Sequence, residues 1–105
     1  MKELRIEGEA EEELWHAVDW YESERPNLGR EFWAEVQKTL DSIQQNPLGS
    51  SLAPHIPERL RVRRRLTNRF PFAVFYLDMR ETIHVLAIAH CHRRPGYWRD
   101  RLRTM

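Results

Sequence analysis

Apolar residues recur along the chain first with the period of a strand and then with the period of a helix. Within residues 2–8, Leu4 and Ile6 alternate with charged residues, which predicts a short strand. Two helical stripes follow and end at Pro26 and Pro47, because proline interrupts a helix. The first stripe consists of Ala10, Leu14, Ala17, Val18 and Tyr21, and the second of Phe32, Val36, Leu40 and Ile43. Because only a few residues separate the two helices, we expect an antiparallel hairpin.

Three strand-like runs occupy the second half of the chain. Residues 72–77 are apolar on both faces, which predicts a central strand, and residues 83–89 are apolar except for His84. Residues 60–67 alternate between two faces. One face carries Leu60, Val62, Arg64 and Leu66, and the other carries Arg61, Arg63 and Arg65. The short connections predict an antiparallel meander of the three strands, and the residues after Pro95 predict a short final helix.

These elements predict an α+β fold with the order β-α-α-β-β-β and a short C-terminal helix, in a single domain over residues 1–105. We expect the helix hairpin to cover one face of a small, mainly antiparallel sheet. Because three unpaired guanidiniums cannot be buried, the face with Arg61, Arg63 and Arg65 is expected to face solvent. Residues 46–58, which hold three prolines, form a loop long enough to be functional.

The net charge of +1 hides a strong asymmetry between the two parts of the chain. Residues 1–46 hold 12 acidic and 5 basic residues, whereas residues 47–105 hold 12 arginines and 4 acidic residues. Arginine suits planar, bidentate contacts with phosphates and carboxylates. Two interpretations stay open: the acidic part packs beside the basic part, or the basic part forms a surface for an acidic or nucleic-acid partner.

Composition also bears on the compartment. The one cysteine, Cys91, cannot form a disulfide within the chain, and no apolar run approaches the roughly 20 residues that span a bilayer. The N-terminal residues are acidic and lack the apolar segment of a signal peptide. We therefore expect a cytoplasmic protein without a membrane partner.

Candidate chemistry gathers in residues 90–98, after the last predicted strand. His90 and His92 are two residues apart, but no third ligand has a convincing spacing, so we expect neither a metal site nor another cofactor. Cys91 and His92, as neighbours on a strand, point to opposite faces, so Cys91 is expected to be a small buried hydrophobic residue rather than a nucleophile.

General acid–base chemistry is a second interpretation of the same residues. A metal-independent ribonuclease would use His92 for proton transfer, Arg93 and Arg94 for phosphate, and Tyr97 for stacking. The alternative is structural: the arginines pair with helix glutamates, and the aromatic residues pack the last helix onto the core. The residues expected to bind a protein partner or target are Arg61, Arg63, Arg65, Arg69, His90 and Trp98.

Five stretches together resemble the RelE/ParE superfamily of toxins from type II toxin–antitoxin systems, and the ParE-like, plasmid-stabilisation branch most closely. They are WYE at 20–22, Leu28-Gly29 with Phe32, Asn46-Pro47, RFPFAVFY at 69–76 and VLAIAHCHRRPGYW at 85–98. The resemblance covers nearly the whole chain and implies the element order given above. It also implies a cognate antitoxin, whose C-terminal segment wraps the toxin and covers its basic face.

The resemblance implies two different toxic activities. ParE-like members inhibit DNA gyrase, and RelE-like members cut mRNA on the ribosome. RelE-like nucleases generally place a basic residue inside the central strand, where this chain has Ala73. This departure favours gyrase inhibition over mRNA cleavage. A third hypothesis is a nucleic-acid-binding or adaptor module without toxicity.

Overall fold

The computed structural model describes residues 1–104 and has the predicted α+β element order. The helices and strands are β1 (Glu3–Ile6), α1 (Gly8–Glu24), α2 (Leu28–Gln45), β2 (Arg63–Leu66), β3 (Phe72–Asp78) and β4 (Thr82–His90). Three short 3-10 helices span Pro47–Gly49, Glu58–Leu60 and Arg99–Thr104. No helix in this part of the chain is both long and apolar enough to cross a bilayer.

One sheet with the strand order β1-β4-β3-β2 contains all four strands. The last three form the predicted antiparallel meander, and β3, apolar on both faces, lies inside the sheet. β1 pairs in parallel with β4 over Thr82–Val85 only. The edge of β4 beyond Val85 therefore carries no further strand.

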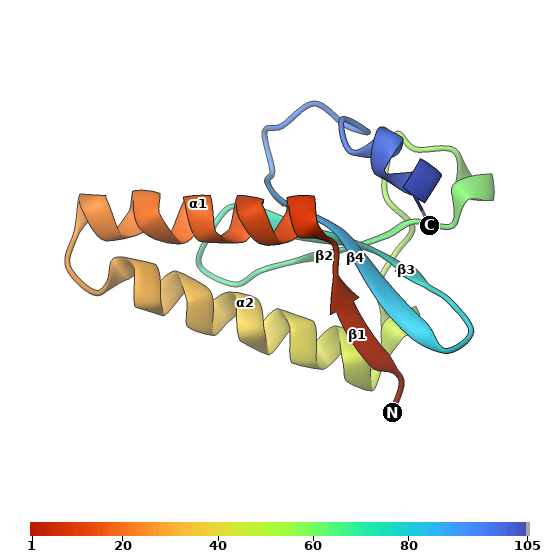
Figure 1. Cartoon of the computed structure of the whole chain (residues 1–105), viewed down its shortest axis with the longest axis horizontal. Coiled ribbons are helices and arrows are strands. Elements are labelled where there is room, and N and C mark those ends of the chain that lie inside the picture. The colour runs from red at the N-terminus through yellow and green to blue at the C-terminus, as the bar shows by residue number, and fades with distance from the viewer. Residues whose placement is uncertain (105) are drawn as a thin grey trace.

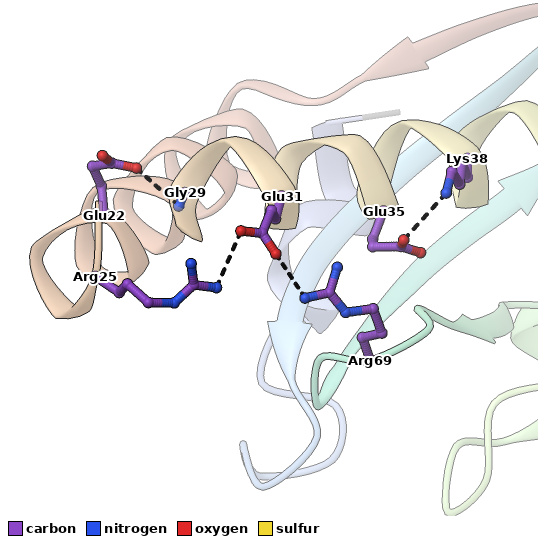
Figure 2. Close-up of polar contacts among 7 residues, drawn as sticks. All are labelled: Glu22, Arg25, Gly29, Glu31, Glu35, Lys38 and Arg69. Carbon is purple, nitrogen blue, oxygen red and sulfur yellow. Dashed lines mark hydrogen bonds and ion pairs between the residues drawn. The ribbon is translucent and has the colours of Figure 1, made fainter. Parts of the chain in front are cut away.

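α1 and α2 form the predicted antiparallel hairpin (Figure 1). The turn between them depends on Glu22, whose carboxylate accepts hydrogen bonds from the backbone N–H groups of Asn27 at 2.9 Å and Gly29 at 3.0 Å (Figure 2 draws the second). Both groups lie at the start of α2, where backbone donors lack partners within the helix. A Cβ atom at Gly29 would lie 2.6 Å from the carbonyl oxygen of Val18, so the helices approach closely here.

The main core fills the space between the helix hairpin and one face of the sheet. The two predicted helical stripes supply one side, and β3 and β4 supply the other. Its buried residues are Ala10, Leu14, Ala17, Phe32, Val36, Leu40, Ile43, Phe70, Val74, Tyr76, Ile83, Val85 and Ile88. The predicted packing of the hairpin on the sheet is thus confirmed.

A second, smaller core covers part of the opposite face of the sheet. It joins Ala53 and Val62 to Leu86, Ala87 and Trp98. A bulge makes this possible: Phe75 pairs with Ala87 but Tyr76 pairs with Val85, so β4 carries one extra residue and its alternation shifts. In Figure 1 the segment around Glu58–Leu60 and the C-terminal segment lie together, away from the hairpin turn.

The predicted placement of the arginine face is wrong. Arg63 pairs with Tyr76 and Arg65 with Val74, and paired residues share a face, so both arginines lie on the helix side of the sheet. Arg61 is not in the strand at all: it caps a 3-10 turn in the left-handed conformation, with φ of 57°.

The two strand arginines are half-buried, and the end of α2 and the loop after it supply acceptors for them. Arg65 donates to the Ser42 hydroxyl at 2.9 Å and to the Asn46 carbonyl at 3.0 Å, both at the C-terminal end of α2. Helix C-termini attract cations because their last carbonyls lack partners within the helix. Arg63 donates to the Ser50 carbonyl at 2.6 Å. Neither side chain forms the solvent-facing stripe that alternation alone suggests.

Candidate functional site

A cavity of about 390 Å³ opens on the face of the sheet that the helices do not cover. Its floor includes Phe75 and Ala89, one wall comes from the loop around His55, and the other comes from residues 90–98. We call this cavity the open-face pocket. It brings His92, Arg93 and Arg94 together, as the sequence predicts, and adds Arg64 from β2.

The open-face pocket is strongly basic. Three arginines and three histidines line it, namely Arg64, Arg93, Arg94, His55, His90 and His92. Within residues 1–104, no lining residue is acidic, and none of these three arginines forms an ion pair. The guanidinium of Arg93 instead lies 3.9 Å from the centroid of the Tyr97 ring. An enclosed site with this composition attracts anions.

Arg64 reaches the pocket because of strand register. It pairs with Phe75 across the β2–β3 ladder, and the next pair on the same face is Leu66 with Ala73. The basic residue that the family resemblance places in the central strand is absent at Ala73. Arg64, on the neighbouring strand, presents a cation to the same cavity.

The two histidines after β4 contact each other. Their ring centroids are 5.0 Å apart, and the backbone N–H of His92 donates to Nδ1 of His90 at 3.1 Å. Neutral His90 therefore carries its proton on Nε2. In the described part of the chain, no three or more His, Cys, Asp or Glu side chains are arranged to hold a metal ion.

Cys91 is exposed, so the prediction that it is a buried hydrophobic residue is wrong. β4 ends at His90, and the Cys91 N–H donates to the Pro71 carbonyl at 2.8 Å as the chain leaves the sheet. The strand alternation on which the prediction relied therefore stops one residue too early to bury this side chain.

The Tyr97 hydroxyl is held by a partly buried cluster of Glu13, Tyr97 and Arg101, which we call the Glu13 cluster. Tyr97 donates to one oxygen of the Glu13 carboxylate, and Arg101 donates to both oxygens, at 2.9 and 3.1 Å. The backbone N–H of Ile88 donates to the same carboxylate at 3.2 Å, and Arg101 donates to the Leu86 carbonyl at 2.8 Å. Burial, and then the hydrogen bond with Glu13, raise the pKa of Tyr97. Its hydroxyl therefore stays protonated.

The residues predicted to bind a partner are scattered. Trp98 is 1% exposed and belongs to the second core, so its side chain presents almost no surface to a partner. Arg69 lies beside α2, where it donates to Glu31 at 2.8 Å, and Glu31 also pairs with Arg25 (Figure 2). These hydrogen bonds, first from Arg69 and then from Arg25, lower the pKa of Glu31. His90 lines the open-face pocket.

A second cavity, of about 810 Å³, lies between α1 and the free edge of β4. We call it the α1 groove. Trp20, which is 55% exposed, Glu12 and His16 line it from α1, and Phe72 and His90 line it from the sheet. Beyond Val85 this edge has no neighbouring strand. Side chains already bond part of this edge, because the Ile88 N–H donates to Glu13 and the Leu86 carbonyl accepts from Arg101. The groove itself is suited to a peptide segment of a partner.

The sequence matches no protein-family model and no curated protein. Among solved structures, it matches a chain described as "Chromosomal ParDE TA system from P. aeruginosa", with a TM-score of 0.73 and 21% identity. The match covers 86% of this chain and 96% of that chain. The two chains share a fold.

Sequence reasoning missed three residues of this region. Arg64 shares a face with Val62 in the strand pattern, and this face lies on the side of the second core. Glu13 lies in a run of acidic residues, and Arg101 lies among the C-terminal arginines. No spacing rule links positions 13 and 101, because only the tertiary fold brings them together.

Proposed function

We propose that this protein is the toxin of a type II toxin–antitoxin pair, that it inhibits DNA gyrase in the cytoplasm, and that a cognate antitoxin neutralises it. The observation that carries this proposal is the shared fold with a chain of a ParDE system over 86% of this chain. The stretches that resemble ParE-like toxins are spread over this fold. They include the start of α2, the central strand and the segment after β4.

The α1 groove supports the antitoxin part of the proposal. Its volume of about 810 Å³ and its aromatic wall at Trp20 suit apolar side chains of a partner. An extended C-terminal segment of the antitoxin can lie in this groove and pack apolar side chains against its aromatic wall. Trp20→Ala should then weaken the complex while leaving the fold intact, because this ring is more than half exposed.

The first test is a supercoiling assay with the purified protein, freed from its antitoxin, together with gyrase and relaxed plasmid. The proposal predicts blocked supercoiling or trapped, cleaved plasmid. Unimpaired gyrase with a protein that still stops growth would contradict the gyrase target. Harmless expression without any antitoxin would contradict toxicity itself and favour the nucleic-acid-binding or adaptor module.

Cleavage of mRNA on the ribosome is the second candidate, and the placement of Arg64 beside His92, Arg93 and Arg94 favours it. Against it, Glu13 holds the hydroxyl of Tyr97, the fourth residue of the predicted catalytic set. His92→Ala separates the two candidates. It should abolish growth arrest by a ribonuclease, but should leave growth arrest by a gyrase inhibitor largely intact.

A further inference from the structure

We propose that a surface patch on the helix hairpin, centred on Trp15 and Trp33, binds a basic segment of the target protein through an arginine or lysine side chain. This inference rests on the proposed function, because it takes DNA gyrase as the target. It goes further by assigning the contact to a surface outside both cavities, since neither the α1 groove nor the open-face pocket is lined by Trp15 or Trp33. We call this surface the tryptophan patch.

A fixed, exposed aromatic pair is the first argument. Trp15 on α1 and Trp33 on α2 have ring centroids 5.1 Å apart, with their planes at 55°. Trp15 is 43% exposed, whereas Trp33 is half-buried and packs against the main core. The Trp15 indole N–H also donates to the Glu11 carboxylate at 3.4 Å. A tryptophan that stays at the surface with restrained rings beside it is a typical centre of a protein interface.

The charge around this pair is the second argument. Glu11 lies one turn before Trp15 on α1 and Asp19 lies one turn after it, so all three share one side of the helix. Both acidic residues are exposed, and within residues 1–104 neither forms an ion pair. Arg30 lies one turn before Trp33 on α2, so the acidic side of the patch is the α1 side. The face of an indole ring attracts a cation, and nearby carboxylates add to that attraction.

The proposed target supplies the complementary charge. Gyrase holds DNA, and proteins that hold DNA contact its phosphates with arginine and lysine side chains. Residues 1–46, which include the whole hairpin, hold 12 acidic and 5 basic residues, whereas residues 47–105 hold 12 arginines and 4 acidic residues. A basic surface therefore attracts the hairpin and repels the rest of the chain. Charge complementarity favours the hairpin as the part that contacts the target.

The test measures binding of the full-length protein to purified gyrase by biolayer interferometry. Trp15→Ala should weaken binding by about 30-fold, the size expected for an interface hot spot. Trp15→Leu keeps an apolar side chain but removes the ring, so it should weaken binding nearly as much when the ligand is a cation. Leu48→Ala shortens a side chain that is 65% exposed in the 3-10 helix after α2, outside the patch, and should bind like the wild type.

Asp19→Asn tests the charge separately from the ring. It should weaken binding about threefold at low ionic strength, the size expected for one exposed ion pair. The difference should shrink at high salt, where exposed charges are screened. Asp100→Asn makes the same substitution at an exposed position of the C-terminal segment and should change binding at neither salt concentration.

The inference is overturned if Trp15→Ala and Asp19→Asn both bind gyrase as tightly as their controls. Wild-type affinity of Trp15→Leu would disprove a cationic ligand. A wild-type dimer that Trp15→Ala converts to a monomer would assign the patch to a second copy. Loss of antitoxin binding by Trp15→Ala, with gyrase binding retained, would assign it to the antitoxin. Asp19 is exposed, so its variant keeps the test valid if Trp15→Ala alters the fold.

The wild-type protein keeps the two proposals separate. Gyrase binding by the wild type that does not depend on the tryptophan patch would contradict this inference and leave the proposed function standing. A wild type that does not bind gyrase would contradict the gyrase target and this inference together.

Discussion

Replacing Glu13 by alanine should destabilise the fold far more than the same replacement at the neighbouring Glu12. The Glu13 carboxylate is 17% exposed and receives four hydrogen bonds, from Tyr97, from both Arg101 nitrogens and from the Ile88 backbone. Truncation would leave the Arg101 guanidinium, which is 13% exposed, without this carboxylate. It would also leave the hydroxyl and the backbone N–H without their acceptor.

The size of the effect follows from these contacts. Removing one partner of a buried ion pair costs about 3–5 kcal/mol. The lower end of that range applies, because this pair is partly exposed and Arg101 keeps its ion pair with Glu9 at 3.3 Å. For a domain of this size, 1 kcal/mol corresponds to a shift in Tm of roughly 4–8 °C. Glu13→Ala should therefore lower Tm by about 12–24 °C.

Thermal denaturation followed by circular dichroism measures this shift, and Glu12→Ala is the matched control. Glu12 lies one residue away on α1, is exposed, and should change stability by less than about 0.5 kcal/mol. Replacing both Glu13 and Arg101 by leucine should recover part of the loss, because it leaves no charge buried. Equal Tm values for Glu13→Ala and Glu12→Ala would refute the importance of the cluster.

Three further predictions concern pH and packing. Because burial and a hydrogen bond raise the pKa of Tyr97, the unfolded chain loses this proton near pH 10 while the folded chain keeps it. Stability to urea should fall as pH rises above about 10, and the stability of the Tyr97→Phe variant should fall less steeply. Hydrogen bonds from two arginines lower the pKa of Glu31 from 4.5, so the stabilisation from this carboxylate is present at neutral pH and is lost as pH falls through its folded-state pKa. Acid denaturation of the Glu31→Gln variant should lack this pH-dependent loss of stability. An acid-denaturation curve that matches the wild type would contradict the predicted role of Glu31. Gly29→Ala should lower Tm, because its Cβ would lie 2.6 Å from the Val18 carbonyl oxygen, whereas Gly8→Ala, with open space around it, should not.

The regular elements could be predicted because each depends on local pattern. The stripes of α1 and α2, the two prolines that follow them, and the apolar run of β3 all act within a few residues. The order of the three antiparallel strands followed from their short connections. The parallel pairing of β1 with β4 joins residues about 80 positions apart, and nothing local specifies it.

The candidate site could be predicted only in part. His92, Arg93 and Arg94 are adjacent in sequence, so grouping them required no tertiary information. The two faces of β2 were predicted the wrong way round because the prediction allowed for only one apolar core. Val62 does face a core, but it is the second one, and Arg63 therefore faces the helices. The Phe75 ring, in the strand predicted to be central, is partly exposed at the pocket.

The bulge in β4 has a consequence for how this domain loses its structure. Val85 and Ile88 pack into the main core, whereas Leu86 and Ala87 pack into the second one, so a single strand holds both together. Neither core can come apart without exposing one side of β4 and weakening the strand on which the other depends. The helix hairpin and the C-terminal segment therefore share one cooperative unit, although they lie on opposite faces of the sheet and are far apart in sequence.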